Sequence, residues 1–183
     1  MKIVAFAASS SSKSINKQLV KYAASQIKGV EVELLDLNDY ELPLFSEDKE
    51  QELGQPQLAH DFLAKLATAD LIMISFAEHN GSYSAAYKNL FDWCSRIKKP
   101  FQHKPMMLLA TSPGKGGGRN VLKQAVESAP HFDGEVKGSF SLPSFNDNFD
   151  VEQGCIIHLK RNAALLEQLS QFNWREYQAK KAQ

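Results

Sequence analysis

The sequence has few cysteines, no excess of charge of either sign and no long apolar run. Its two cysteines, Cys94 and Cys155, lie in no CxxC pair or other metal-ligand spacing, so neither a disulfide framework nor a metal site is expected. Lysine plus arginine equals aspartate plus glutamate at 21 each, which gives no reason to expect nucleic acid as a partner. No apolar stretch approaches the roughly 20 residues that a membrane-spanning helix needs. We therefore expect a soluble cytoplasmic protein with no membrane or nucleic-acid partner.

Short apolar runs are present instead. They are typical of strands that are covered on both faces, as in a parallel sheet flanked by helices. Five such strands are predicted, at Ile3–Ala8, Val30–Leu37, Leu71–Ala77, Pro105–Ser112 and, less regularly, Val136–Leu142. The chain length of 183 residues fits a single domain over residues 1–183.

Apolar residues at helical spacing predict helices between these strands, within residues 15–27 and 83–97, and a last helix from about residue 151 to residue 172. Alternating strands and helices predict an α/β fold, an open doubly wound parallel sheet with helices on both faces. Ligands of such sheets bind beyond the carboxyl ends of the strands, where the strand order switches. The loops after the first, third and fourth strands are therefore the candidate site.

The first of these loops reads "SSSSKSIN" from Ser9 to Asn16. A helix that starts near Ser14 offers unpaired backbone N–H groups and the positive end of its dipole, which together favour an anion such as phosphate. The serine hydroxyls and the Asn16 amide would add donors, and Lys13 would add positive charge. A serine that only caps the helix is the alternative interpretation.

The second loop, "AEHNGS" from Ala77 to Ser82, forms a polar turn at the end of a buried strand. Its alternative interpretation is an ordinary turn in which Gly81 supplies unusual backbone angles and Ser82 caps the next helix. The third loop, "TSPGKGGGRN" from Thr111 to Asn120, has four glycines in five positions, which would let backbone N–H groups approach a ligand. It lacks the GxxxxGK[ST] pattern of ATP-binding loops and does not follow the first strand, as a dinucleotide fingerprint must.

Taken together, the three loops resemble those of the NADPH-dependent FMN reductase family, which has a flavodoxin-like fold. The family's first loop, approximately G-S-x-R-x-x-S-x-N, is matched at Ser9, Ser14 and Asn16. Its second, P-E-Y-N-x-S, is matched at Glu78, Asn80 and Ser82. Its third, S-x-G-x-x-G-G, is matched fully, at Ser112, Gly114, Gly117 and Gly118.

This resemblance implies a five-stranded sheet of order 2-1-3-4-5, bound FMN, NADPH or NADH as electron donor, and a quinone, flavin or similar small molecule as acceptor. The flavin would carry the chemistry, so no side chain is assigned as a general acid or base. Family members are commonly homodimers or homotetramers. The FMN-binding residues that the resemblance implies are Ser9, Ser11, Ser14, Ile15, Asn16, Ala77, Glu78, His79, Asn80, Ser82, Ser112, Gly114, Gly117 and Gly118.

The sequence also departs from the family pattern. Ala8 replaces the glycine and Ser11 the arginine of the first motif, while Ala77 and His79 replace the proline and tyrosine of the second. An FMN-binding electron carrier and a non-catalytic flavodoxin-like protein that binds a partner therefore remain as alternatives. A hydrolase is disfavoured because the chain has no GxSxG nucleophile elbow.

Overall fold

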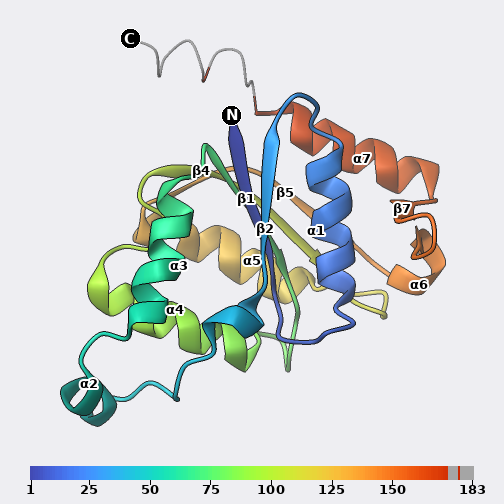
Figure 1. Ribbon diagram of the computed structural model, residues 1–183. Helices are drawn as coiled ribbons and strands as arrows, with labels where there is room; N and C mark the ends of the chain where they lie inside the picture. Colours follow the sequence, from blue (N-terminus) through green and yellow to red (C-terminus); the bar gives the residue numbers. More distant parts are fainter. Residues whose placement is uncertain (173–176, 178–183) are drawn as a thin grey trace.

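A five-stranded parallel sheet of order β2-β1-β3-β4-β5 forms the centre of the computed structural model, which describes residues 1–172 and residue 177 (Figure 1). This is the predicted strand order. The strands are β1 (Lys2–Ala8), β2 (Glu31–Leu35), β3 (Leu71–Phe76), β4 (Lys104–Thr111) and β5 (Gly134–Leu142). The chain adds β2 on one side of β1 and then returns to add β3 on the other. The strand order therefore switches between β1 and β3.

Helices cover both faces of the sheet (Figure 1). One face carries α1 (Ile15–Ser25) and α7 (Leu159–Ser170), and the other carries α3 (Gln57–Ala67), α4 (Ala85–Ile97) and α5 (Arg119–Ser128). Successive side chains of a strand point to opposite faces, so Val4 and Phe6 pack in one core layer while Ile3 and Ala5 pack in the other. Both layers are apolar, which explains why the central strands are continuous apolar runs rather than alternating ones.

Short elements complete the chain. The segment between β2 and α3 includes a 3₁₀ helix, η1 (Leu37–Tyr40), and α2 (Glu47–Leu53). A second 3₁₀ helix, η2 (Ala129–Phe132), leads into β5, and α6 (Phe145–Asn148) follows that strand.

The prediction of one helix over residues 151–172 was wrong in its first third. Residues 151–156 instead form the turn and the second strand of an antiparallel pair, β6 (Phe149–Asp150) and β7 (Cys155–Ile156), and Gly154 in the turn has φ of 65°. Phe149 pairs with Ile156, and both side chains are buried in the α1 and α7 layer. The apolar residues of this stretch therefore pack as a hairpin before α7 begins.

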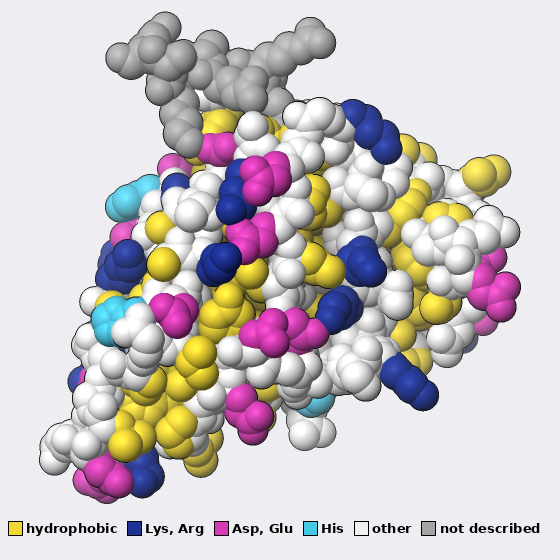
Figure 2. Space-filling model, viewed as in Figure 1, with side chains coloured by type: hydrophobic (Ala, Val, Ile, Leu, Met, Phe, Trp, Pro, Cys, Tyr) yellow, Lys and Arg dark blue, Asp and Glu magenta, His cyan; other side chains and the backbone are white. Residues whose placement is uncertain are grey.

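The surface carries charges of both signs side by side, and Figure 2 shows them interspersed over the face in view. Glu33 on β2 illustrates the arrangement, since it contacts Lys2 Nζ at 2.7 Å and Lys65 Nζ at 2.6 Å. Hydrogen bonds from Lys2 and then Lys65 lower the pKa of the Glu33 carboxyl. Within the described residues, no helix has the length and apolar character needed to cross a bilayer.

Candidate active site

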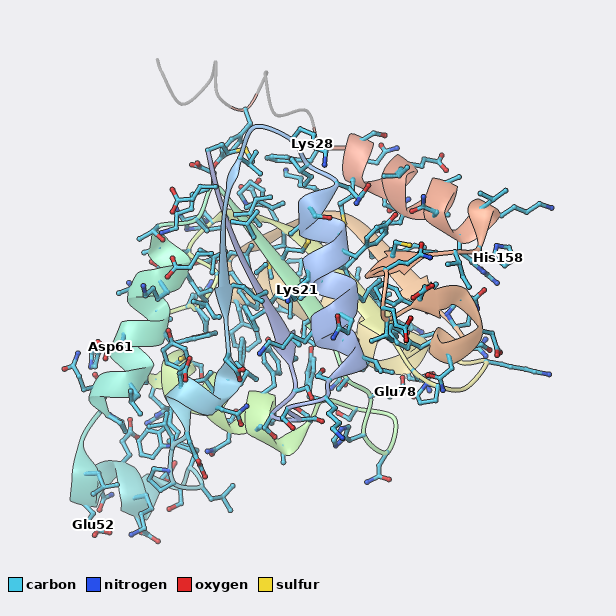
Figure 3. The ribbon with its side chains drawn as sticks, turned by 45° about the vertical axis from the view of Figure 1, so that its right-hand side comes forward. Lys21, Lys28, Glu52, Asp61, Glu78 and His158 are labelled. Atoms are coloured by element: carbon cyan, nitrogen blue, oxygen red, sulfur yellow. The ribbon has the colours of Figure 1, made fainter. Side chains whose placement is uncertain are left out.

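The three predicted loops meet at the carboxyl edge of the sheet, beside the switch in strand order. They enclose a cleft of about 290 Å³ next to the first turn of α1. Figure 3 places Glu78 at this end of the molecule, below the start of α1. The residues that line the cleft are Ser9, Ser11, Lys13, Ser14, Ile15, Asn16, Ala77, Glu78, His79, Thr111, Ser112 and Pro113.

The N-terminus of α1 presents unpaired hydrogen-bond donors to this cleft. Ser14 is the N-cap, because its Oγ accepts a hydrogen bond from Lys17 N at 3.2 Å, as the capping interpretation expected. Its hydroxyl proton has no acceptor among the described residues, nor do the backbone N–H groups of Lys13, Ile15 and Asn16. Capping and anion binding are thus compatible, since the cap uses the Ser14 oxygen and leaves these donors free.

Asn16 has a different place from the one expected of it. The residue is 2% exposed, and its Nδ2 donates to Thr111 O at 3.1 Å. Its Oδ1 accepts from Ser75 Oγ at 2.8 Å and from Thr111 N at 3.0 Å. The amide therefore ties the start of α1 to the ends of β3 and β4, and it positions the cleft, while the Asn16 backbone N–H is the group that is free for an anion.

Lys13 supplies the positive charge of the cleft. It has no ion pair with any residue that the structure describes, whereas Lys17, one turn further on, is paired with Asp36. The hydrogen bond from Lys17 lowers the pKa of Asp36. Lys13 is exposed and lies two residues after Ser11, the position where the family's first motif has its arginine.

The second loop is a tight hairpin. His79 N donates to Ser82 O at 2.9 Å and Ser82 N donates to His79 O at 3.0 Å, while Asn80 and Gly81 have φ of 51° and 80°. Positive φ at both central residues is that of a type I′ turn, for which Asn-Gly is the favoured sequence. Asn80 and Ser82 do not line the cleft, and Ser82 Oγ donates to Gln124 Oε1 on α5 at 3.0 Å.

The expected helix cap at Ser82 lies instead at Ser84. Ser84 Oγ accepts from Tyr87 N at 3.3 Å in the first turn of α4 and donates to Ala8 O at 2.8 Å at the end of β1. Ser84 is 3% exposed, so this hydroxyl joins α4 to the central strand within the core. The helix consequently begins at Ala85, two residues later than the predicted start at residue 83.

Glu78 joins the second loop to the third. Its carboxylate accepts hydrogen bonds from Asn120 N at 2.9 Å, Val121 N at 3.0 Å and Asn120 Nδ2 at 3.2 Å. The N-cap residue of α5 is Gly118, which has no side chain to satisfy these first-turn N–H groups. Glu78 therefore acts as a cap supplied from a neighbouring loop, and its negative charge also suits the positive end of the α5 dipole.

Two glycines of the third loop are required by packing. Gly117 and Gly118 have φ of 62° and 74°. A Cβ on Gly117 would lie 2.4 Å from Ser141 Oγ and 2.9 Å from Pro143 N, and one on Gly118 would lie 2.9 Å from Ala110 Cβ. These contacts are with β5, the segment after it and β4. The loop thus needs both glycines to close against the sheet, while a Cβ on Gly114 would meet nothing within 4 Å.

The structure brings nine of the fourteen predicted residues to the cleft wall, namely Ser9, Ser11, Ser14, Ile15, Asn16, Ala77, Glu78, His79 and Ser112. It does not bring Asn80, Ser82, Gly114, Gly117 or Gly118 there.

The sequence prediction did not include Thr111 and Pro113. They flank Ser112 at the carboxyl end of β4, and the rule that ligands bind beyond the carboxyl ends of the strands could have identified them. It also did not include Ser75, which hydrogen-bonds to Asn16. The one sequence feature that could have drawn attention to Ser75 is that it is the only polar residue in the apolar run "LIMISF".

Comparison with known proteins identifies the family. The model of the NADPH-dependent FMN reductase family matches residues 1–147. The chain belongs to this family. Among its relatives, an NADPH:quinone oxidoreductase of Arabidopsis thaliana is 34% identical over 131 residues, covering 69% of this chain and 65% of that protein. A quinone reductase of Escherichia coli is 29% identical over 130 residues, covering 65% and 68% of the two chains. The chain thus spans slightly less than two thirds of the Arabidopsis protein.

A solved structure supports the fold. FerB, a flavoenzyme NAD(P)H:(acceptor) oxidoreductase from Paracoccus denitrificans, superposes with a TM-score of 0.71 at 21% identity, covering 93% of this chain and 92% of that one. Family membership and flavodoxin-like fold therefore agree with what the loop motifs implied.

Proposed function

We propose that this protein is an FMN-dependent NAD(P)H oxidoreductase whose acceptor is a quinone, a flavin or a similar small molecule. The observation that carries the proposal is the cleft at the switch in strand order, where the first turn of α1 offers unpaired donors in a chain of the FMN reductase family. Bound FMN would supply the redox chemistry, taking a hydride from NADPH to leave NADP⁺ and passing two electrons to the acceptor, whose reduced form would take up one further proton from water.

The donor set fits the phosphate of FMN. Hydroxyls of Ser9, Ser11 and Ser14, the backbone N–H groups of Ile15 and Asn16 and the α1 dipole would together hold it. Lys13 would supply the positive charge in place of an arginine. Ser9 Oγ and Ser14 Oγ each accept a hydrogen bond within the chain, from Ser11 N and Lys17 N. The N–H groups of Ile15 and Asn16 have no acceptor among the described residues, so they remain available to a phosphate.

The flavin ring would lie between the second and third loops, along Ala77, Glu78 and His79 on one side and Ser112 on the other. Asn80 and Ser82 would shape the second loop, and Gly114, Gly117 and Gly118 the third. Their contribution is to position the ring and to stabilise charge. The backbone N–H groups of Gly114, Lys115 and Gly116 have no acceptor among the described residues, so they are free to stabilise negative charge on the reduced ring. No proton transfer by a side chain is required in this scheme.

Anaerobic reduction tests the proposal. NADPH added to the FMN-loaded protein should bleach the flavin absorption band, and benzoquinone should then restore it, whereas free FMN at the same concentration serves as the control for uncatalysed reduction. Bound FMN that neither NADPH nor NADH bleaches would assign the protein to the electron carriers. A protein that takes up no FMN would support the partner-binding alternative.

We also propose that the protein works in the cytoplasm as a homodimer or homotetramer in which a second subunit helps to cover the flavin. Both cysteines are free thiols, which suits a reducing compartment. Leu44, in the segment that follows β2, is 80% exposed and is an apolar side chain that a second subunit would bury. Sedimentation of the FMN-loaded protein measures the oligomeric state, and a monomer would contradict this part of the proposal.

A further inference from the structure

A second hollow lies on the opposite face of the sheet from α1, between α4 and α5. Its volume is about 230 Å³, and none of the residues that line the flavin cleft lines it. Phe76 and Leu108 of the sheet form its floor, and Tyr83, Tyr87 and Phe91 form the wall at and before α4. The facing wall on α5 and η2 includes the small residues Ala125 and Ala129. Aromatic rings opposite alanines leave the space open.

Two hydrogen bonds join the two walls of this cavity and fix the distance between them. Ser82 Oγ donates to Gln124 Oε1 at 3.0 Å, and the hydroxyls of Tyr83 and Ser128 lie 3.0 Å apart in a second bond. Both bonds connect the segment before α4 to α5, and three of the four residues line the cavity. The cavity is therefore preformed, so a ligand would not have to separate packed helices.

One polar group on the cavity wall has no hydrogen-bond partner in the described chain. Tyr87 is 4% exposed and lines the cavity, and its hydroxyl has no hydrogen-bond partner among the described residues. Its ring packs against Phe76 and Tyr83, with centroids 5.3 Å and 5.1 Å away. Burial raises the pKa of Tyr87 well above its ordinary value, so the hydroxyl stays protonated and able to donate. The Tyr87 oxygen is not fully buried, so solvent reaches the hydroxyl and it is available to a molecule in the cavity.

Charge and size define the ligand. Lys88 and Asp92 are the charged residues that line the cavity, and they are paired with each other at 2.6 Å, so the site offers no free charge for an ion. An apolar cavity of about 150 Å³ is known to hold benzene, and 230 Å³ leaves room for one ring with a small polar substituent but not for a three-ring flavin. The ligand should therefore be neutral, aromatic and monocyclic.

We propose that this cavity is a second small-molecule site that binds a neutral, single-ring phenol, with the ring among the aromatic side chains and the phenol oxygen accepting a hydrogen bond from Tyr87. The site is separate from the proposed flavin cleft and does not depend on it. The bound ring would make edge-on and tilted contacts of the kind that Tyr87 makes with Phe76 and Phe91, and Phe76 with Tyr83.

Calorimetric titration with phenol and with benzene tests the site, on the protein with and without FMN so that the flavin cleft is either filled or free. Tyr87→Phe should weaken phenol binding about fivefold, the worth of one net hydrogen bond, and should change benzene binding by less than about twofold. Ala125→Leu should weaken both at least about tenfold by filling the cavity. Ala163→Leu, the same change at an exposed site on α7, is the matched control and should leave both unchanged.

Several results would overturn the proposal. Phenol that fails to bind at millimolar concentration, or binding that disappears when FMN fills the other cleft, would remove this site. Unchanged phenol affinity in Ala125→Leu would also remove this site, provided that thermal unfolding shows the variant to be folded. If Ala125→Leu does not fold, Ser128→Leu, at the half-buried edge of the cavity, is tested in its place with the same criterion. A change of oligomeric mass in the filled variants, without phenol binding by the unmodified protein, would assign the cavity to a subunit interface.

Discussion

Replacing Asn16 by leucine should lower the free energy of unfolding by about 3 to 5 kcal/mol, although the side chains are similar in size. The substitution removes three hydrogen bonds and leaves Ser75 Oγ and the N–H and C=O of Thr111 without their partner inside the core. Each buried polar group left in this state costs roughly 1 to 3 kcal/mol. Denaturation in urea, followed by circular dichroism, measures the loss.

A second substitution distinguishes the loss of the Asn16 hydrogen bonds from a change in side-chain packing. Ser75→Ala alone should cost less, because Asn16 keeps both of its bonds to Thr111. In Asn16→Leu with Ser75→Ala, one orphaned hydroxyl is absent, so the double variant should be more stable than the sum of the two single losses predicts. A loss below about 1 kcal/mol in Asn16→Leu, or strict additivity of the two changes, would contradict the bridging role.

Replacing Gly117 by valine should destabilise the protein by roughly 2 to 5 kcal/mol, whatever its effect on flavin binding. A β-branched residue at a φ of 62° costs about 1 to 2 kcal/mol. Its Cβ would in addition meet Ser141 Oγ at 2.4 Å and Pro143 N at 2.9 Å, an overpacking that costs about 1 to 3 kcal/mol more. Thermal unfolding of the purified variant measures this effect directly.

Gly114→Val is the matched control in the same loop. A Cβ at Gly114 meets nothing within 4 Å, so the variant should unfold close to the unmodified protein. Equal stability of Gly117→Val and Gly114→Val would contradict the close contact of Gly117 with Ser141 and Pro143. The comparison also prevents a folding defect from being interpreted as a binding defect.

The sheet could be predicted from the sequence because its central strands are buried on both faces. Runs such as "LIMISF" need no knowledge of distant residues, since burial on both sides leaves a continuous apolar signal. The segment 151–158 was misassigned because helical spacing alone cannot exclude a short hairpin. Ile156 of this segment pairs with Phe149, which precedes it, across a turn at Gly154, and pairing of this kind leaves no helical or strand period in so few residues.

The location of the site could also be predicted from the sequence, but the roles of its residues could not. Loops after parallel strands meet at one edge, so the cleft could be placed from the strand order. The role of Asn16 depends on Ser75 and Thr111, which lie 59 and 95 residues away in the chain. The cap that Glu78 provides to α5 depends on a residue 42 positions later. Partners at such separations become visible only when the sheet brings them together.

The central claim is that the start of α1 binds the phosphate of FMN, and a comparison of FMN with riboflavin tests it most directly, because riboflavin lacks only that phosphate. Fluorescence titration should give roughly tens- to hundreds-fold tighter binding of FMN, from hydrogen bonds worth about 1 kcal/mol each and a dipole worth up to about 1 kcal/mol. Lys13→Ala should reduce this preference and Ser11→Arg should increase it, with riboflavin affinity nearly unchanged in both. Equal affinities for FMN and riboflavin in the unmodified protein would contradict the claim and leave the serine loop as a helix cap alone.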